Sequence, residues 1–219
     1  MKRSTIYGIA LLIGSVGMIT TLAFHPTAHD LLSPDGQMAR RYEIITMATH
    51  SLALVSFPIL VFGFHGLSRG LGLDRPPVSA ALIAYAFAAV AGMFAAVVSG
   101  LIAPVLTGQI PGADESTGNL LQLILKYNGL LNQAFAKIVV CASSIAVVLW
   151  SGSILRISKF AQVVGLIGFV VGIASIVAFL SGHLRLNVHG FGLFIFAQSV
   201  WVILLGVFLW RSGDSLQAA

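Results

Sequence analysis

Residues 160–181 read FAQVVGLIGFVVGIASIVAFLS and contain no charged side chain. An α-helix needs about 20 consecutive, mostly apolar residues to cross the hydrocarbon core of a bilayer. This stretch therefore predicts a transmembrane helix. Five further stretches have a comparable length and apolar character, namely 4–24, 44–67, 79–105, 132–155 and 188–210. We expect an all-α, polytopic integral membrane protein that forms a bundle of six transmembrane helices.

The composition of the whole chain leads to the same class. Of its 219 residues, 58% are hydrophobic and only 9% are charged, whereas soluble domains carry about 25% charged residues. Such a chain has too few polar groups to cover its surface in water, so the lipid bilayer is its expected surrounding. The six spans occupy most of the length, which predicts one transmembrane domain, 1–219, in the cell membrane.

The N-terminal stretch also has features of a signal peptide, because Lys2 and Arg3 precede its apolar part. However, no clear A-x-A cleavage pattern follows it. We therefore expect residues 4–24 to remain as the first transmembrane helix.

The basic residues give a net charge of +5 but form no patch, so a nucleic-acid partner is not expected. They lie at the span ends, as topology signals do. One side of the predicted bundle carries seven, and the other carries four: Lys2, Arg3, Arg69, Arg75, Arg156, Lys159 and Arg211 against Arg40, Arg41, Lys126 and Arg185. Because Lys and Arg are enriched in cytoplasmic loops, both termini are predicted to be cytoplasmic.

The segment 119–126, NLLQLILK, lies in one of the longer predicted outer connections. It is apolar with sparse polar positions, which is typical of a helix lying at the membrane interface. An outward extension of the fourth span, bent near Gly129, explains the same pattern.

Small residues in other spans predict close helix packing. Examples are Gly92 in the third span and Gly172 in the fifth.

Histidines are the strongest indication of chemistry. With this topology, five of the six lie near the extracytoplasmic face: His25, His29, His50, His183 and His189. Imidazole is the commonest metal ligand near neutral pH, and it suits copper and haem iron. We predict that these histidines hold haem or copper. The alternative is that they lie at the interface only because imidazole is amphipathic.

His50 differs because it lies inside an apolar helix, where an ionisable side chain usually faces the bundle interior. We expect it to line an outward-opening cavity that also contains Lys137 or at least one of His183 and His189. These four residues are the predicted cofactor-binding set. Lys137 has its own alternative, since its long side chain can extend to the membrane interface. On the cytoplasmic side His65 has no second histidine, so the count allows one outer haem but not two bis-histidine haems.

Three functions fit these patterns. The first is a small redox or electron-transfer protein with a haem or copper site at the extracytoplasmic helix ends. The second is an accessory or scaffold subunit without its own chemistry, which binds a membrane-protein partner or a second copy of itself. The third is a small-solute transporter whose cavity is lined by His50, Gln133 and Lys137.

Overall fold

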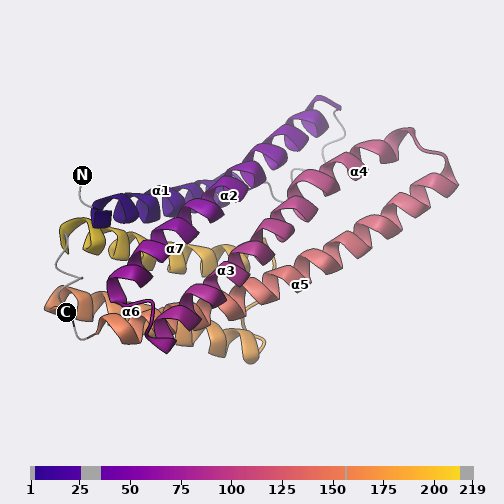
Figure 1. The fold of residues 1–219 in the computed structure, drawn as a ribbon. Helices are drawn as coiled ribbons and strands as arrows, with labels where there is room; N and C mark the ends of the chain where they lie inside the picture. The colour runs from indigo at the N-terminus through magenta and orange to yellow at the C-terminus, as the bar shows by residue number, and fades with distance from the viewer. Residues whose placement is uncertain (1–2, 26–35, 156, 213–219) are drawn as a thin grey trace.

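The structure is a computed structural model that describes residues 3–25, 36–155 and 157–212. All the regular elements in these ranges are helical, and they pack as a bundle (Figure 1). The long helices are α1 (Arg3–Ala23), α2 (Gly36–Leu71), α3 (Pro76–Val97), α5 (Glu115–Ile154), α6 (Lys159–Leu180) and α7 (Val188–Ser212). Three short elements join α3 to α5, namely the π-helix η2 (Val98–Ile102), α4 (Ala103–Gln109) and the 3-10 helix η3 (Ile110–Gly112).

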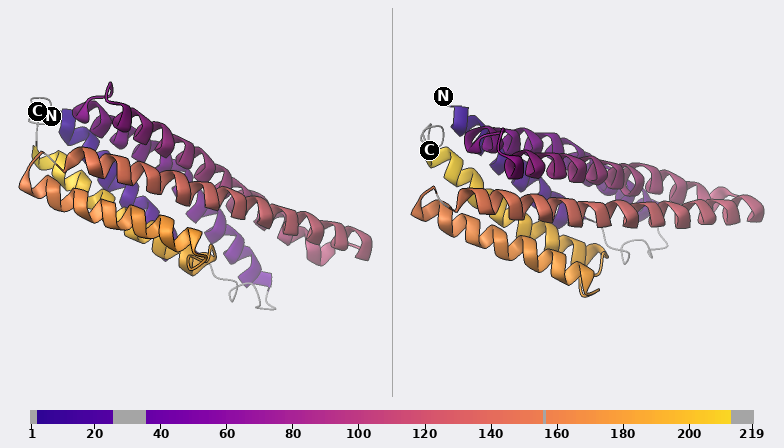
Figure 2. Two further views of the ribbon diagram at one scale, coloured as in Figure 1. Left: turned by 90° about the horizontal axis from the view of Figure 1, so that it is seen from below. Right: turned by 60° about the horizontal axis from the view of Figure 1, so that its bottom comes forward.

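Six helices in the described ranges are long and apolar enough to cross a membrane. The predicted all-helical architecture is therefore confirmed, and six helices have the length and apolar composition of membrane spans, as in a multi-pass membrane protein. The start of α1 and the end of α7 lie at the same end of the bundle (Figure 2). We call this the terminal end and the opposite one the distal end. That the terminal end faces the cytoplasm stays a prediction.

The fourth span is much longer than its predicted range of 132–155. Helix α5 runs without interruption for 40 residues, which corresponds to about 60 Å at 1.5 Å per residue. Segment 119–126 belongs to it, so of the two alternatives the outward extension is the one found. Asp114 caps this helix, since its side chain accepts a hydrogen bond of 2.9 Å from the Thr117 N–H.

Helices α3 and α4 and the short elements between and after them run alongside α5. Together these elements form a long hairpin that extends beyond the rest of the bundle at the distal end (Figures 1 and 2). The hairpin replaces the outer loop that was expected between the third and fourth spans.

Aromatic side chains fill the terminal half of the bundle. The Phe64 ring stacks on Trp150 with a centroid distance of 4.3 Å and an interplanar angle of 3°. The buried indole N–H groups are satisfied, because Trp150 donates to Ser68 Oγ and Trp201 donates to the Val164 carbonyl, both at 3.0 Å. This half is therefore densely packed.

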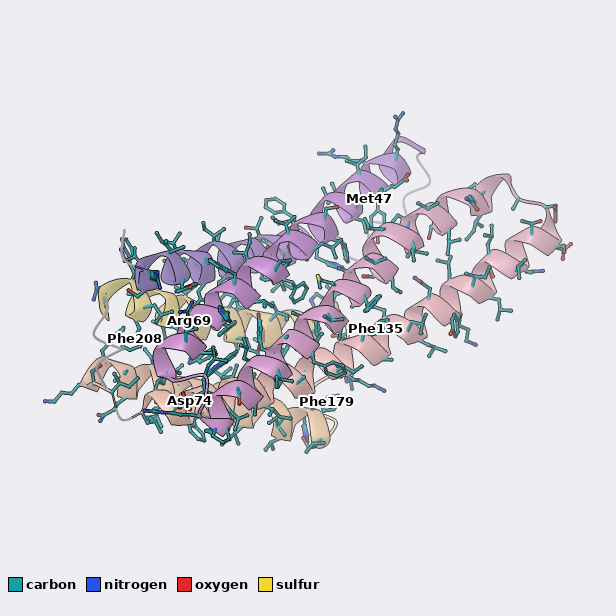
Figure 3. The ribbon with its side chains drawn as sticks, in the orientation of Figure 1. Met47, Arg69, Asp74, Phe135, Phe179 and Phe208 are labelled. Atoms are coloured by element: carbon teal, nitrogen blue, oxygen red, sulfur yellow. The ribbon has the colours of Figure 1, made fainter. Side chains whose placement is uncertain are left out.

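Figure 3 shows the side chains that fill the space between the helices. In this view Met47 marks the distal part of α2, and Arg69 marks its terminal part.

Small residues permit the close helix contacts, as predicted for the third and fifth spans. A Cβ atom on Gly92 would collide with the Phe57 ring, and one on Gly172 would come within 2.7 Å of Val148 Cγ2. Both glycines therefore lie against a neighbouring helix rather than against lipid.

A candidate ligand cavity lined by histidines

A cavity of about 320 Å³ lies in the distal half of the bundle, among α1, α2, α3, α5 and α7. We call it the histidine cavity. Its apolar wall includes Met18, Phe57 and Ile195. Its polar residues include His25, His50, Ser99, Asn132, Gln133 and Asn187. A mostly apolar cavity with a few converging polar groups is the usual form of a small-molecule site.

His50 lies in the wall that α2 contributes. Its side chain is only 6% exposed, and it faces the cavity as expected from its place in an apolar helix. Its Nδ1 donates a hydrogen bond of 2.8 Å to the Thr46 carbonyl, one turn earlier in the helix. In a neutral imidazole this leaves Nε2 as the nitrogen that can accept a hydrogen bond or bind a metal.

His25 is the neighbour of His50. The two ring centroids are 5.0 Å apart, with one ring presenting its edge to the other at an interplanar angle of 61°. The contact arises because α1 and α2 pack against each other with His25 just beyond the end of α1. Thr21 strengthens this packing, since its hydroxyl lies 3.2 Å from the Thr49 carbonyl of α2.

The π-helix η2 contributes Ser99 to the cavity wall and packs against α2. A Cβ atom on its Gly100 would collide with the His50 ring, so only glycine allows the imidazole to lie there. The buried Asn128 of α5 donates a hydrogen bond of 2.8 Å to the Val98 carbonyl at the start of the π-helix. A π-helix alters the regular backbone bonding, and such turns occur frequently at functional sites.

The distal rim of the cavity is held by α5 and the turn between α6 and α7. Gln133 donates a hydrogen bond of 2.8 Å from Nε2 to the Leu186 carbonyl in that turn. The side chain of Asn187 caps the start of α7 by accepting from the Gly190 N–H at 2.8 Å. The rim is thus fixed by side-chain hydrogen bonds to backbone.

Three of the predicted cofactor-binding residues lie elsewhere. Lys137, His183 and His189 are exposed and do not line the histidine cavity. Their expected convergence on His50 is therefore not found, and His25 takes that position. His183 instead pairs with Ser181, with Nδ1 and Oγ 2.9 Å apart. That any of these residues binds a cofactor stays a prediction.

The rotation of α5 explains the position of Lys137. The residues of α5 that line the cavity are Asn132, Gln133 and Ala136. At 100° per residue, Lys137 points about 90° away from the centre of that arc, on the far side of Gln133. Its exposed side chain agrees with the alternative in which it extends to the membrane interface.

Of the five histidines predicted to hold a metal, His183 and His189 do not line the histidine cavity. His29 lies outside the described residues. Within residues 3–25, 36–155 and 157–212, no group of three or more His, Cys, Asp or Glu side chains is placed to hold a metal ion. Four of the five predicted histidines lie in the described residues. Of these four, only His25 and His50 line the histidine cavity.

The sequence interpretation missed the π-helix and its contact with Asn128. The signal in the sequence was Asn128, which lies in the apolar segment before the fourth predicted span. That segment was assigned to a connection rather than to a buried helix.

Comparison of the chain with protein-family models, with curated proteins and with solved structures found no match.

Proposed function

We propose that this chain is an integral membrane protein that binds a small amphipathic molecule in the histidine cavity. The observation that carries the proposal is the buried His50, whose Nδ1 is bound to the Thr46 carbonyl and whose ring lines a cavity of about 320 Å³. This volume lies within the range of about 300–1,000 Å³ that is usual for small-molecule sites.

The two ends of the cavity differ in chemistry. His25, His50 and Gln133 supply polar groups toward the distal rim, whereas Met18 and Phe57 supply apolar surface toward the bundle centre. An amphipathic molecule satisfies both ends when its polar group faces the histidines. Because Nε2 of a neutral His50 accepts a hydrogen bond, the ligand needs a donor such as a hydroxyl, phenol or hydroquinone group.

A thermal-shift series tests this assignment. The probes are phenols and hydroquinones, each paired with its methyl ether, which keeps the apolar body but lacks the donor. We expect the phenols to raise the melting temperature of the wild-type protein more than the ethers do. The His50→Ala protein should lose that difference because the acceptor is gone.

His65→Ala is the matched control, since His65 lies near the terminal end of the same helix and does not line the cavity. It should keep the full difference between phenols and ethers. Equal shifts for the phenols in the wild-type and His50→Ala proteins would contradict the proposal.

A copper ion held between His25 and His50 is a second candidate, because the 5.0 Å centroid distance is close to what one bridging ion needs. Metal–imidazole bonds are about 2 Å long, so a small rotation of the two rings gives room for an ion. Imidazole is a suitable ligand for copper. A haem between these rings would need space for a whole porphyrin, so the spacing favours a single ion. Such an ion would supply the redox chemistry expected from the sequence.

Copper titration of the purified, metal-stripped protein tests the second candidate. We expect about one equivalent bound per chain, with loss of binding in both His25→Ala and His50→Ala. The His65→Ala protein should bind as the wild type does. If both variants still bound copper as the wild type does, the copper site would not be the one between His25 and His50.

A further inference from the structure

A second, smaller cavity lies in the middle of the bundle, next to the histidine cavity on its terminal side. Its volume is about 30 Å³, and we call it the central chamber. Ser15, Tyr85, Ser143, Gln198 and Ser199 line it. Ser15 lies near the middle of α1, and Gln198 lies near the middle of α7. These polar side chains lie in a lining that is otherwise apolar, and they lie at a depth where lipid offers no hydrogen bonds.

Ser15 is the unusual member of this group. Its side chain is 1% exposed, and its Oγ has no hydrogen-bond partner among the residues that the structure describes. A buried hydroxyl without a partner is unfavourable, because it has lost its hydrogen bonds to water. Because Ser15 also lines the chamber, a molecule bound there would satisfy it.

The other polar groups around the chamber have bonding capacity left. Ser143 donates its hydroxyl hydrogen to the Val139 carbonyl at 2.7 Å, which leaves its oxygen lone pairs as acceptors. Gln198 uses Nε2 toward Ser144 Oγ at 3.5 Å, which leaves its carbonyl oxygen as an acceptor. A water molecule needs two to four such partners and about 10–15 Å³ of this kind of volume. The chamber has both.

We infer that the central chamber is a water-binding site, which holds one or two water molecules between Ser15 and the polar side chains of α5 and α7. This inference concerns a different cavity from the proposed ligand site and does not depend on it.

Water reaches the chamber from the histidine cavity. Met18, Phe57 and Ile195 line both cavities, so these side chains are the partition between them. Methionine is unbranched and adaptable, which lets a partition of this kind open for a small molecule. On the terminal side Phe64 lines the chamber and stacks on the fully buried Trp150. We therefore expect the path to end at the middle of the bundle.

Silver-ion accessibility tests the path, because a metal ion reacts with a thiolate in water but not with a thiol in dry lipid. Ser15→Cys is made in a Cys141→Ser background, and the protein is placed in lipid nanodiscs. After timed exposure to Ag⁺, the thiols that remain are counted with a fluorescent maleimide in denaturant. We expect Ser15→Cys to be consumed at least about tenfold faster than a lipid-facing cysteine.

Val16→Cys in the same background is the matched control, since Val16 is the next residue on α1 and is 56% exposed on the lipid-facing surface. Equal rates for the two cysteines would overturn the inference.

Thermal stability gives an independent readout that needs no reagent to enter. If water bonds to Ser15, then Ser15→Ala removes a hydrogen bond and lowers the melting temperature. Ser151 is the control, because its buried Oγ also lacks a partner in the described residues but does not line the chamber. Ser151→Ala should raise the melting temperature or leave it unchanged. A rise for Ser15→Ala would mean that its hydroxyl is dry and would overturn the inference.

Discussion

The His50 ring lies against Gly100 of the π-helix η2, in space that any side chain at position 100 would occupy. The glycine therefore sets the position of the imidazole in the histidine cavity. Since His50 is fixed on its other side by the Thr46 carbonyl, the ring has little freedom to move away from a larger residue.

Gly100→Ala should accordingly displace His50 and destabilise the bundle. Inserting a methyl group into a packed site costs about 1–3 kcal/mol. The expected results are a lower melting temperature and a loss of the phenol-dependent thermal shift. Gly129→Ala is the control, because nothing lies within 4 Å of a Cβ at that position of α5. Equal behaviour of the two alanine variants would show that His50 does not depend on the glycine.

The small-residue contacts give a second prediction. Replacing Gly92 with Leu should push α3 away from Phe57, and Gly172→Leu should push α6 away from Val148. Each variant should lower the melting temperature in detergent, by an amount corresponding to about 1–3 kcal/mol or more. Gly118→Leu, in open space on α5, should have a much smaller effect. Unchanged stability of the Gly92 and Gly172 variants would contradict these two helix contacts.

The six spans could be predicted from the sequence because lipid imposes a minimum apolar length on each of them. Lipid imposes no maximum length on a helix. The sequence therefore left two alternatives for segment 119–126, a separate interfacial helix and an outward extension of the fourth span. The site was harder to predict. The pairing of His25 with His50 depends on how α1 packs on α2, and the exclusion of Lys137 depends on the rotation of α5. Neither the packing of two helices nor the rotation of one follows from hydropathy.

The orientation of the bundle is a third prediction, from the distribution of Lys and Arg. A cysteine at Ala113, at the tip of the distal hairpin, should react with a membrane-impermeant maleimide added to intact cells. A cysteine at Asp74, in the connection between α2 and α3, should react only after the membrane is permeabilised. Both are made in the Cys141→Ser background. The reverse pattern would place the termini outside the cytoplasm.

Asn128 provides the last prediction. Its side-chain N–H bonds the Val98 carbonyl at 2.8 Å in a buried position, so it connects α5 to the π-helix that carries Gly100. The Val98 carbonyl also accepts from the Ala103 N–H, so removing the Asn128 donor loses one of its two hydrogen bonds, at a cost of about 0.5–1.5 kcal/mol. Asn128→Ala should therefore lower the melting temperature and weaken ligand binding in the histidine cavity. Asn128→Leu should do the same, because its side chain has a similar size but no donor.

Asn119→Ala is the control, because it removes an exposed asparagine from the same helix. It should leave both stability and binding close to the wild-type values. If Asn128→Ala lowered stability but left binding intact, the hydrogen bond would support the hairpin without shaping the cavity. If both properties fell together, the π-helix and the position of His50 would be coupled, as the contact between Gly100 and the imidazole requires.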